Sequence, residues 1–316
     1  MFRTIVEIQP SPCKITYQDQ IITLGSCFSE NIGNKLQNAF LLTDINPFGV
    51  LFNPVSIKNS IQMLLENKRF CENDLFFDRS LWNSYAHSTM FSAPIVDETL
   101  HKINSRIETA IKSLKNASFL LITFGTAWVF ENKETKEIVS NCHKQPSDKF
   151  QRYRLKVDDI IGDYIALIHK LNILYPDLKI IFTVSPIRHW KDGAHENNVS
   201  KATLLLAIDK LCACFPFVYY FPAYEIMMDE LRDYRFYADD MFHPSEMAVN
   251  YIWQRFIETY FSSENRKLIT RLEQLQKDLQ HRPIHPDSIE NSFFNYKIQD
   301  KKTNLKKEFP FLSDRF

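Results

Sequence analysis

Apolar positions along the chain recur with two periods, and these periods predict strands that alternate with helices. Short apolar runs rich in β-branched and aromatic residues are typical of buried parallel strands. Longer segments with apolar residues three or four positions apart predict amphipathic helices. The predicted strands cover residues 21–24, 41–45, 118–124, 178–184 and 217–221. The helices predicted between and after them cover residues 29–40, 54–66, 97–115, 156–174, 200–214 and 245–261.

This alternation predicts an α/β protein. We expect a three-layer α/β/α sandwich, in which a flavodoxin-like parallel sheet of about five strands lies between two layers of helices. An edge strand over 3–8 is expected to lead into it. The aromatic stretch 70–95 has no clear period and predicts a loop excursion. The stretch 127–150 predicts an insertion with a hairpin over 127–130 and 137–139.

The chain is expected to divide into one large domain over 1–261 and a C-terminal segment over 262–316. In the C-terminal segment, leucines at helical spacing predict one amphipathic helix over 264–280. Pro283 and Pro286 are expected to end this helix, and a polar tail is predicted after them.

The composition is normal for a soluble globular protein, with 45% hydrophobic and 24% charged residues among 316. Lys plus Arg and Asp plus Glu both number 38, and a net charge of zero argues against nucleic acid or an anionic membrane as the main partner. We identify neither a secretory leader nor an apolar stretch of membrane-spanning length, so we expect a cytoplasmic protein. Six cysteines in a chain of this length do not predict a disulfide scaffold.

The sequence gives no indication of a metal or a cofactor. No spacing of histidine, cysteine or carboxylate residues matches a metal site that we can name. Neither a Walker loop nor a GxGxxG sequence is present, which disfavours nucleotide binding. The oligomeric state is left open by the sequence.

Ser26 follows Gly25 at the end of the first predicted strand and at the start of the first predicted helix. Such a turn places a hydroxyl outside the packed sheet, and the free N–H groups of the helix start can stabilise an anion beside it. Ser26 is therefore a candidate nucleophile. The alternative interpretation is a strand–turn–helix connection in which Ser26 only caps the helix.

Asp240 and His243 are separated by two residues, and Pro244 follows just before a predicted helix. In an Asp-x-x-His turn the carboxylate can hold one ring nitrogen and leave the other free, as a general base requires. A serine hydroxyl needs such a base to become a nucleophile. The carboxyl ends of parallel strands meet at one edge of a sheet, so these groups are expected to converge there. The alternative for His243 is a capping role at the last helix.

Several short stretches resemble the motifs of a known family. GSCFSENIG at 25–33 resembles the motif that names the GSCFA family. Further matches are NPFG at 46–49, TFGTA at 123–127, NCHK at 141–144 and TVSPIRH at 183–189. The order of an early serine, strand-end glycines and Asp-x-x-His before a C-terminal helix is similar to that of the SGNH (GDSL-type) hydrolases.

The resemblance to SGNH hydrolases implies a role for each matching residue. Ser26 would be the nucleophile, His243 the base and Asp240 the group that orients it. The backbone N–H groups of Ser26 or Cys27 and of Gly49 would form the oxyanion hole. The resemblance implies a serine esterase or acyl-hydrolase that acts on a small-molecule or carbohydrate ester. The alternatives are an acyltransferase that uses the same acyl-enzyme and a non-catalytic ligand-binding protein on this fold.

The sequence departs from the SGNH pattern in two places. The serine of that pattern follows Gly-Asp, whereas Ser26 follows Gly25 directly. The third block of the pattern supplies an asparagine as oxyanion donor, whereas the matching turn here carries Thr126. The Thr126 hydroxyl, or the side chain of Asn46 or Asn141, would have to replace it.

Other residues near the predicted strand ends are candidates for chemistry or substrate binding. Cys27 could be the nucleophile in place of Ser26, with His143 as its base, since a helix start lowers a thiol pKa. Arg188 and His189 follow a strand end and are expected to face the same edge. Arg188 could bind a carboxylate or phosphate of a substrate, or it could form an ion pair with a nearby carboxylate. The candidates for substrate binding are Asn46, Asn141, His143, Arg188 and His189.

Overall fold

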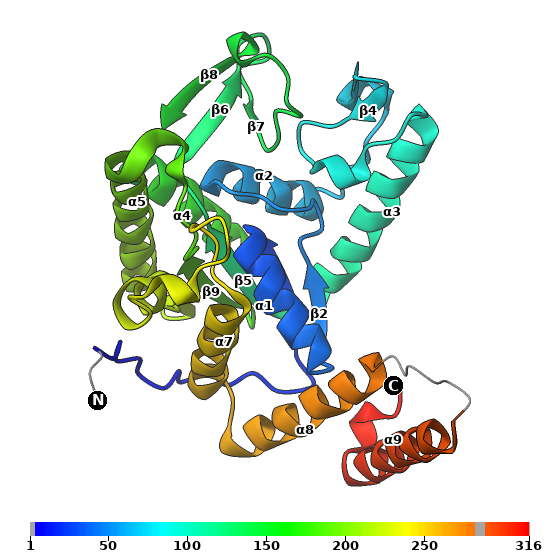
Figure 1. Cartoon of the computed structure of the whole chain (residues 1–316). Coiled ribbons are helices and arrows are strands. Elements are labelled where there is room, and N and C mark those ends of the chain that lie inside the picture. The colour runs from blue at the N-terminus through cyan, green and yellow to red at the C-terminus, as the bar shows by residue number, and fades with distance from the viewer. Residues whose placement is uncertain (1–3, 282–287, 316) are drawn as a thin grey trace.

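A computed structural model describes residues 4–281 and 288–315 of the chain. Its centre is a five-stranded parallel sheet with the strand order β2-β1-β5-β9-β10 (Figure 1). The strands are β1 (Gln20–Gly25), β2 (Leu42–Ile45), β5 (Ala117–Phe124), β9 (Lys179–Val184) and β10 (Val218–Tyr220). In chain order this is the flavodoxin-like arrangement 2-1-3-4-5, so the predicted fold class is confirmed.

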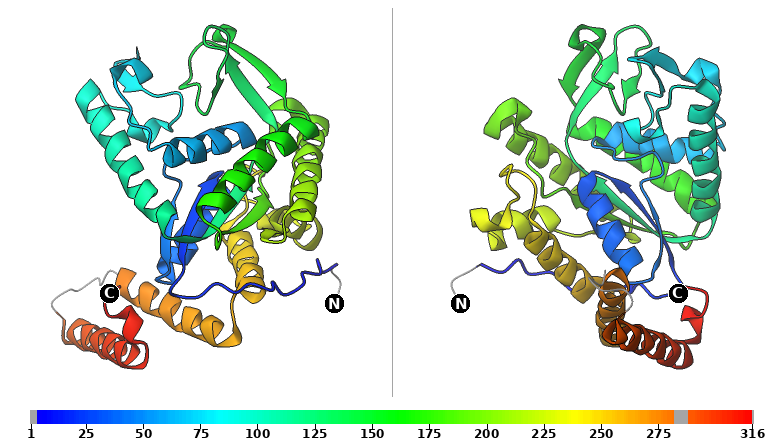
Figure 2. Two further views of the ribbon diagram at one scale, coloured as in Figure 1. Left: turned by 180° about the vertical axis from the view of Figure 1, so that it is seen from behind. Right: turned by 45° about the vertical axis from the view of Figure 1, so that its right-hand side comes forward.

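Helices cover both faces of the sheet (Figures 1 and 2). One face packs against α2 (Pro54–Leu65), α3 (Val96–Lys115), α4 (Val157–Leu174) and α5 (Gly193–Cys214). The other face packs against α1 (Cys27–Asn38) and α7 (Glu246–Tyr260). Side chains alternate between the two layers along each strand, with Ile22 in one core and Ile21 in the other. The apolar residues whose spacing predicted the strands and helices therefore form the two hydrophobic cores.

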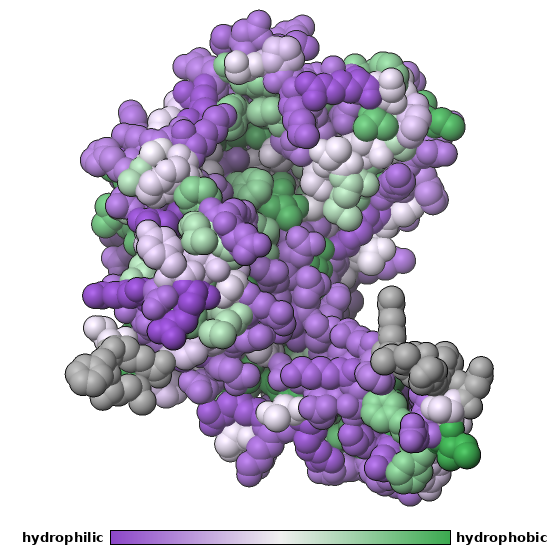
Figure 3. Space-filling view, in the orientation of Figure 1, coloured by the Kyte–Doolittle hydropathy of each residue, from purple (hydrophilic) through white to green (hydrophobic). Residues whose placement is uncertain are grey.

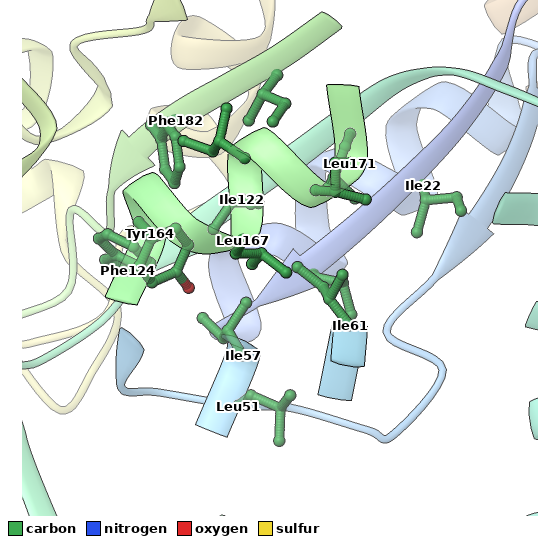
Figure 4. Packing of buried hydrophobic residues seen from close by; sticks show 14 of the residues in the cluster. Ile22, Leu51, Ile57, Ile61, Ile122, Phe124, Tyr164, Leu167, Leu171 and Phe182 are labelled. Atoms are coloured by element: carbon green, nitrogen blue, oxygen red, sulfur yellow. The ribbon is translucent and has the colours of Figure 1, made fainter. Parts of the chain in front are cut away.

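Figure 4 shows how the first of these cores holds the strand ends in place. Phe124 of β5 and Phe182 of β9 pack on Tyr164 of α4, with ring centroids 5.1 and 5.6 Å from it. The hydroxyl of Tyr164 donates to the carbonyl of Pro54, 2.9 Å away, at the first residue of α2. The carboxyl ends of β5 and β9 and the start of α2 are thereby fixed to one another.

Two insertions carry more regular structure than the sequence predicted. The excursion 70–95 contains a short hairpin of β3 (Phe76–Asp78) and β4 (Leu81–Asn83). The hairpin of β6 (Trp128–Asn132) and β7 (Ile138–Val139) is present and gains a third antiparallel strand, β8 (Phe150–Arg154). Strand β8 has little apolar signal of its own, because three of its five residues, Gln151, Arg152 and Arg154, are polar or charged.

One predicted strand does not form in the described residues, and the predicted start of one helix was wrong. Residues 4–8 form no strand, and instead Val6 is held by bonds from its N–H to Glu230 (2.7 Å) and from Arg255 to its carbonyl (2.6 Å). Helix α5 begins at Gly193 rather than at residue 200, because its first two turns are polar and give no apolar period. A short helix, α6 (Ala223–Glu225), and a π-turn over Ile226–Glu230 follow β10.

The described part of the C-terminal segment contains the α-helices α8 (Ser263–Gln280) and α9 (Ile289–Glu308). The predicted helix over 264–280 is confirmed, but α9 lies where a polar tail was expected. The predicted breaks at Pro283 and Pro286 lie outside the described residues. Figures 1 and 2 place both helices at the end of the molecule opposite the β6-β7-β8 sheet. Among the described residues, no helix has the length and apolar character needed to cross a membrane.

Candidate active site

A cavity of about 670 Å³ lies at the carboxyl ends of β1, β5 and β9. Segments far apart in the sequence line it: the start of α1, residues 50–53 before α2, the β6-β7-β8 insertion, the loop 187–192 and residues 242–243. In Figure 3 this face is hollowed below the β6-β7-β8 sheet, and apolar residues gather in the hollow. Both Ser26 and His243 line this cavity.

The backbone before Ser26 fixes the position of its hydroxyl. Gly25 has a φ of +141°, and a Cβ there would lie 2.2 Å from the carbonyl oxygen of Thr123 on the neighbouring strand. Only glycine fits this close approach of two strands. Ser26 is the N-cap of α1, and its Oγ accepts a 3.3 Å bond from the N–H of Phe28. The serine is buried, and its Oγ lies in the positive electrostatic potential at the N-terminus of α1.

Asp240 holds the ring of His243 in the way the sequence predicted. Nδ1 of His243 lies 2.5 Å from one carboxylate oxygen, and the other oxygen accepts 2.9 Å bonds from the N–H groups of Phe242 and His243. These backbone bonds, His243 first, and the ring bond lower the pKa of Asp240 to about 2. The carboxylate therefore stays charged, and Nδ1–H is the tautomer that it favours.

Ser26 and His243 share the cavity but are not hydrogen-bonded to each other in the described part of the chain. The His243 side chain is half exposed, at 50%, and belongs to a loop rather than to a helix or strand. Nucleophile and base often come within bonding distance only when a substrate is present.

The predicted oxyanion donor Gly49 is used elsewhere. Its N–H donates to the carbonyl of Asn46 at 2.7 Å, which closes the turn after β2, and Gly49 faces a neighbouring groove instead of the cavity. Val50 does line the cavity, and its N–H has no hydrogen-bond partner among the residues described. The N–H of Cys27 lies in the first turn of α1, where no carbonyl four residues earlier is available.

Thr126, the other predicted donor, lines the cavity but is held in a local network. Its N–H donates to the carbonyl of Phe52 at 2.9 Å. Its Oγ accepts from the N–H of Trp128 at 3.2 Å and lies 3.1 Å from the hydroxyl of Ser200. The structure therefore gives Thr126 a role in shaping the turn after β5.

The candidates for substrate binding fall into two groups. Asn141, Arg188 and His189 line the cavity. His143 does not, because its Nε2 lies 2.8 Å from the carbonyl of Ser84 beneath the 70–95 excursion. Asn46 does not line the cavity either, and its side chain has a structural role. Its Oδ1 accepts a 3.0 Å hydrogen bond from the N–H of Gly25, and its buried Nδ2 has no partner in the described chain.

Comparison with known families decides the identity of the chain. The model of the GSCFA family matches residues 20–256. The chain belongs to the GSCFA family. Among solved structures it is similar to a Clostridium thermocellum family 3 carbohydrate esterase, with 12% identity and a TM-score of 0.33 over 79% of this chain and 99% of that chain. Curated protein sequences gave no match.

One residue at the site of this GSCFA protein was missed in the sequence. Lys201 is buried under the strand ends, and its Nζ donates to the carbonyls of Gly125 at 2.7 Å and Ser185 at 2.8 Å. Burial lowers its pKa from 10.5 to about 7. The available signal was a lysine at helical spacing from Leu204 and Ile208, which lie on the buried face of α5.

The two other reactive groups beside Ser26 are poor bases and nucleophiles in this GSCFA site. Burial raises the pKa of the Cys27 thiol, whereas a nucleophilic cysteine needs a lowered pKa. Burial, with the charge of Lys201, lowers the pKa of His189 to about 3. Within the described residues, no group of three or more His, Cys, Asp or Glu side chains is placed to hold a metal ion.

Proposed function

We propose that this GSCFA protein is a serine acyl-hydrolase that cleaves an ester bond through an acyl-enzyme on Ser26. One observation carries the proposal. Ser26, at a glycine-forced turn, lines the same cavity as His243, whose Nδ1 lies 2.5 Å from the Asp240 carboxylate. A serine, a histidine and a carboxylate in these roles recur on unrelated folds that perform acyl transfer.

In the proposed reaction, Ser26 Oγ attacks the ester carbonyl carbon while Nε2 of His243 takes the hydroxyl proton. The carbonyl oxygen becomes an oxyanion, and then the bond to the alcohol breaks as His243 returns the proton to the departing oxygen. A water molecule attacks the acyl-enzyme in the same way, and its proton passes through His243 back to Ser26. Asp240 keeps its charge and stabilises the imidazolium that forms twice per cycle.

The oxyanion would be stabilised by backbone groups rather than by an asparagine side chain. Cys27 and Val50 line the cavity, and their N–H groups donate no hydrogen bond to the described turns beside them. Gly49, the donor that the sequence suggested, is replaced by its neighbour in this proposal. Each such donor contributes about 3 kcal/mol to the stability of a tetrahedral intermediate.

Hydrolysis of short para-nitrophenyl esters tests the proposal. Wild-type protein is expected to release nitrophenol, and Ser26→Ala and His243→Ala are each expected to lower kcat by roughly 10⁴-fold. Ser262→Ala is the matched control, because Ser262 also caps a helix, α8, and does not line the cavity. Intact esters with every variant and with the wild type would contradict the proposal.

A ligand-binding protein on the same fold is the second candidate. The engagement of Gly49 and Thr126 in local bonds favours it, because two of the predicted oxyanion donors are then absent. An acyltransferase differs from the hydrolase only in the acceptor. Adding a small alcohol to the ester assay separates the two enzymes, since a transferase yields the exchanged ester in preference to the acid.

A further inference from the structure

The cavity that contains Ser26 and His243 is basic. Four cationic residues line it, and one carboxylate, that of Asp192, accompanies them. The cationic residues are Lys144, Arg152, Arg188 and Lys191. Arg152 forms an ion pair with Asp192, so the other three have no carboxylate partner among the cavity-lining residues that the structure describes.

Of these three described cations, Arg188 is the one with a buried donor atom. Its Nε is buried and makes no hydrogen bond within the described residues. Its guanidinium carbon lies 5.4 Å from the ring centre of Trp190. Trp190 in turn stacks on Phe242, with centroids 5.5 Å apart, and Phe242 precedes His243. The guanidinium is therefore held against an aromatic pair that reaches the loop of the catalytic histidine.

Three other arginines that pack on the domain have carboxylate partners, namely Arg106 with Asp44, Arg154 with Glu196 and Arg255 with Glu230. Arg188 forms no ion pair with any described residue, although the sequence alone left that alternative open. A buried guanidinium N–H without an acceptor, such as that of Arg188 Nε, is unfavourable unless a ligand supplies one.

We propose that the ester substrate carries an oxyanionic group, a carboxylate or a phosphate, and that Arg188 binds this group. The inference rests on the proposed function, since it names the substrate class of the same site. The planar guanidinium donates two parallel bonds to either group. Lys191, with its Nζ 5.3 Å from the ring of Phe130 on the cavity wall, adds to the positive potential that attracts anions.

Matched esters test the substrate class. The probes are para-nitrophenyl hydrogen glutarate, para-nitrophenyl 3-phosphonopropionate and the neutral para-nitrophenyl valerate. We expect kcat/KM for at least one anionic ester to exceed that for the valerate by about tenfold or more, since a bond to a charged group contributes that much. The better anionic ester identifies the group. A neutral ester that is cleaved as fast as both anionic esters overturns the proposal.

Substitutions of Arg188 test whether this residue causes the preference for anionic esters over neutral ones. Arg188→Gln is expected to bring the ratio of anionic to neutral kcat/KM close to one, and Arg188→Lys to give an intermediate ratio. Arg154→Gln is the control, because Arg154 pairs with Glu196 and does not line the cavity. Circular dichroism checks that each variant is folded. A ratio unchanged in folded Arg188→Gln protein overturns the proposal.

A binding measurement separates this inference from the proposed esterase activity. Isothermal titration calorimetry on Ser26→Ala protein, with glutarate and with inorganic phosphate, is expected to show that at least one of them binds. Adding Arg188→Gln is expected to weaken that binding at least about tenfold. If the esters stay intact but the anion binds through Arg188, the esterase proposal fails and the anion site stands. If neither anion binds, or if the second substitution changes nothing, the anion site is overturned.

Discussion

At the scale of single residues, the proposed chemistry depends on how Asp240 is held. Its pKa is lowered to about 2, first by the N–H of His243 and then by that of Phe242 and the histidine ring. A carboxyl whose folded-state pKa is lowered stabilises the fold above its unfolded value of 3.8, and this contribution is lost as pH falls through about 2. The pair therefore stays intact across the range in which an esterase is assayed.

Ionisation of Asp240 should therefore cause no rise or fall of kcat/KM with pH. We expect kcat/KM for ester hydrolysis, measured from pH 4 to 9, to show no ionisation that Asp240→Asn removes. The same substitution should lower kcat by roughly 10³- to 10⁴-fold at every pH, because the amide favours the wrong tautomer of His243. An Asp240→Asn variant that is as active as the wild type would contradict this role.

Lys201 gives a residue-scale prediction about stability. Its pKa of about 7 in the fold lies below its ordinary 10.5, so between these values the unfolded chain binds more protons. The free energy of unfolding contributed by Lys201 must rise with pH over this interval. Denaturant unfolding from pH 7 to 10 should show the wild type gaining stability relative to Lys201→Met. Parallel curves for the two proteins would show that the lysine is charged in the fold.

At the scale of elements, the β1–α1 turn determines the position of Ser26, the proposed nucleophile. Gly25→Ala forces a side chain into a positive φ and against the Thr123 carbonyl, and it should cost at least about 1–3 kcal/mol of unfolding free energy. Gly162→Ala is the matched control, because its Cβ meets no atom within 4 Å and it lies in α4. The control should stabilise the protein by about 0.5–1 kcal/mol. Denaturant titrations that give the two variants equal stability would contradict this account of the turn.

The elements that the sequence predicted well are those whose residues carry one clear apolar period. The strand at Ser118–Phe124 is a largely apolar run because both of its faces are buried. The helix after residue 97 has apolar residues at helical spacing because one of its faces is buried. The polar start of α5 and strand β8 were missed because their order comes from tertiary contacts. Arg152 of β8, for example, is paired with Asp192 just before α5.

At the scale of the whole molecule, strand order determines which distant residues meet. Ser26, Thr126 and Arg188 could be placed at one edge from the sequence because parallel strands end there. The hydrogen bonds that occupy Gly49 and Thr126 could not be predicted, since they depend on turn geometry and on Ser200 from another helix. The position of Lys201 at the strand ends could not be predicted either, because its hydrogen-bond partners are the backbone carbonyls of Gly125 and Ser185.

The C-terminal helices give a prediction at this scale. Of the described residues in α9 and the turn after it, Ile298, Leu305 and Leu312 are buried. Figures 1 and 2 place α9 at the end of the molecule opposite the β6-β7-β8 sheet, which lines the cavity. Deletion of 288–316 should therefore lower the unfolding free energy by about 2–4 kcal/mol and leave ester hydrolysis unchanged.

Leu272→Ala is a point substitution in α8 whose loss of stability can be compared with that of the deletion. Leu272 is completely buried in the core that α8 shares with α1 and α7, so its truncation should cost about 2–5 kcal/mol by itself. Thermal unfolding followed by circular dichroism measures both proteins. A folded deletion variant without activity would show that α9 contributes to the site.

The central claim is that Ser26 is a nucleophile activated by His243, and covalent labelling tests it most directly. Intact protein is treated with a serine-directed fluorophosphonate, and the modified peptide is identified by mass spectrometry. We expect one label, on Ser26, that disappears in Ser26→Ala and forms far more slowly in His243→Ala. No label on the wild type, or a label that persists in Ser26→Ala, would contradict it.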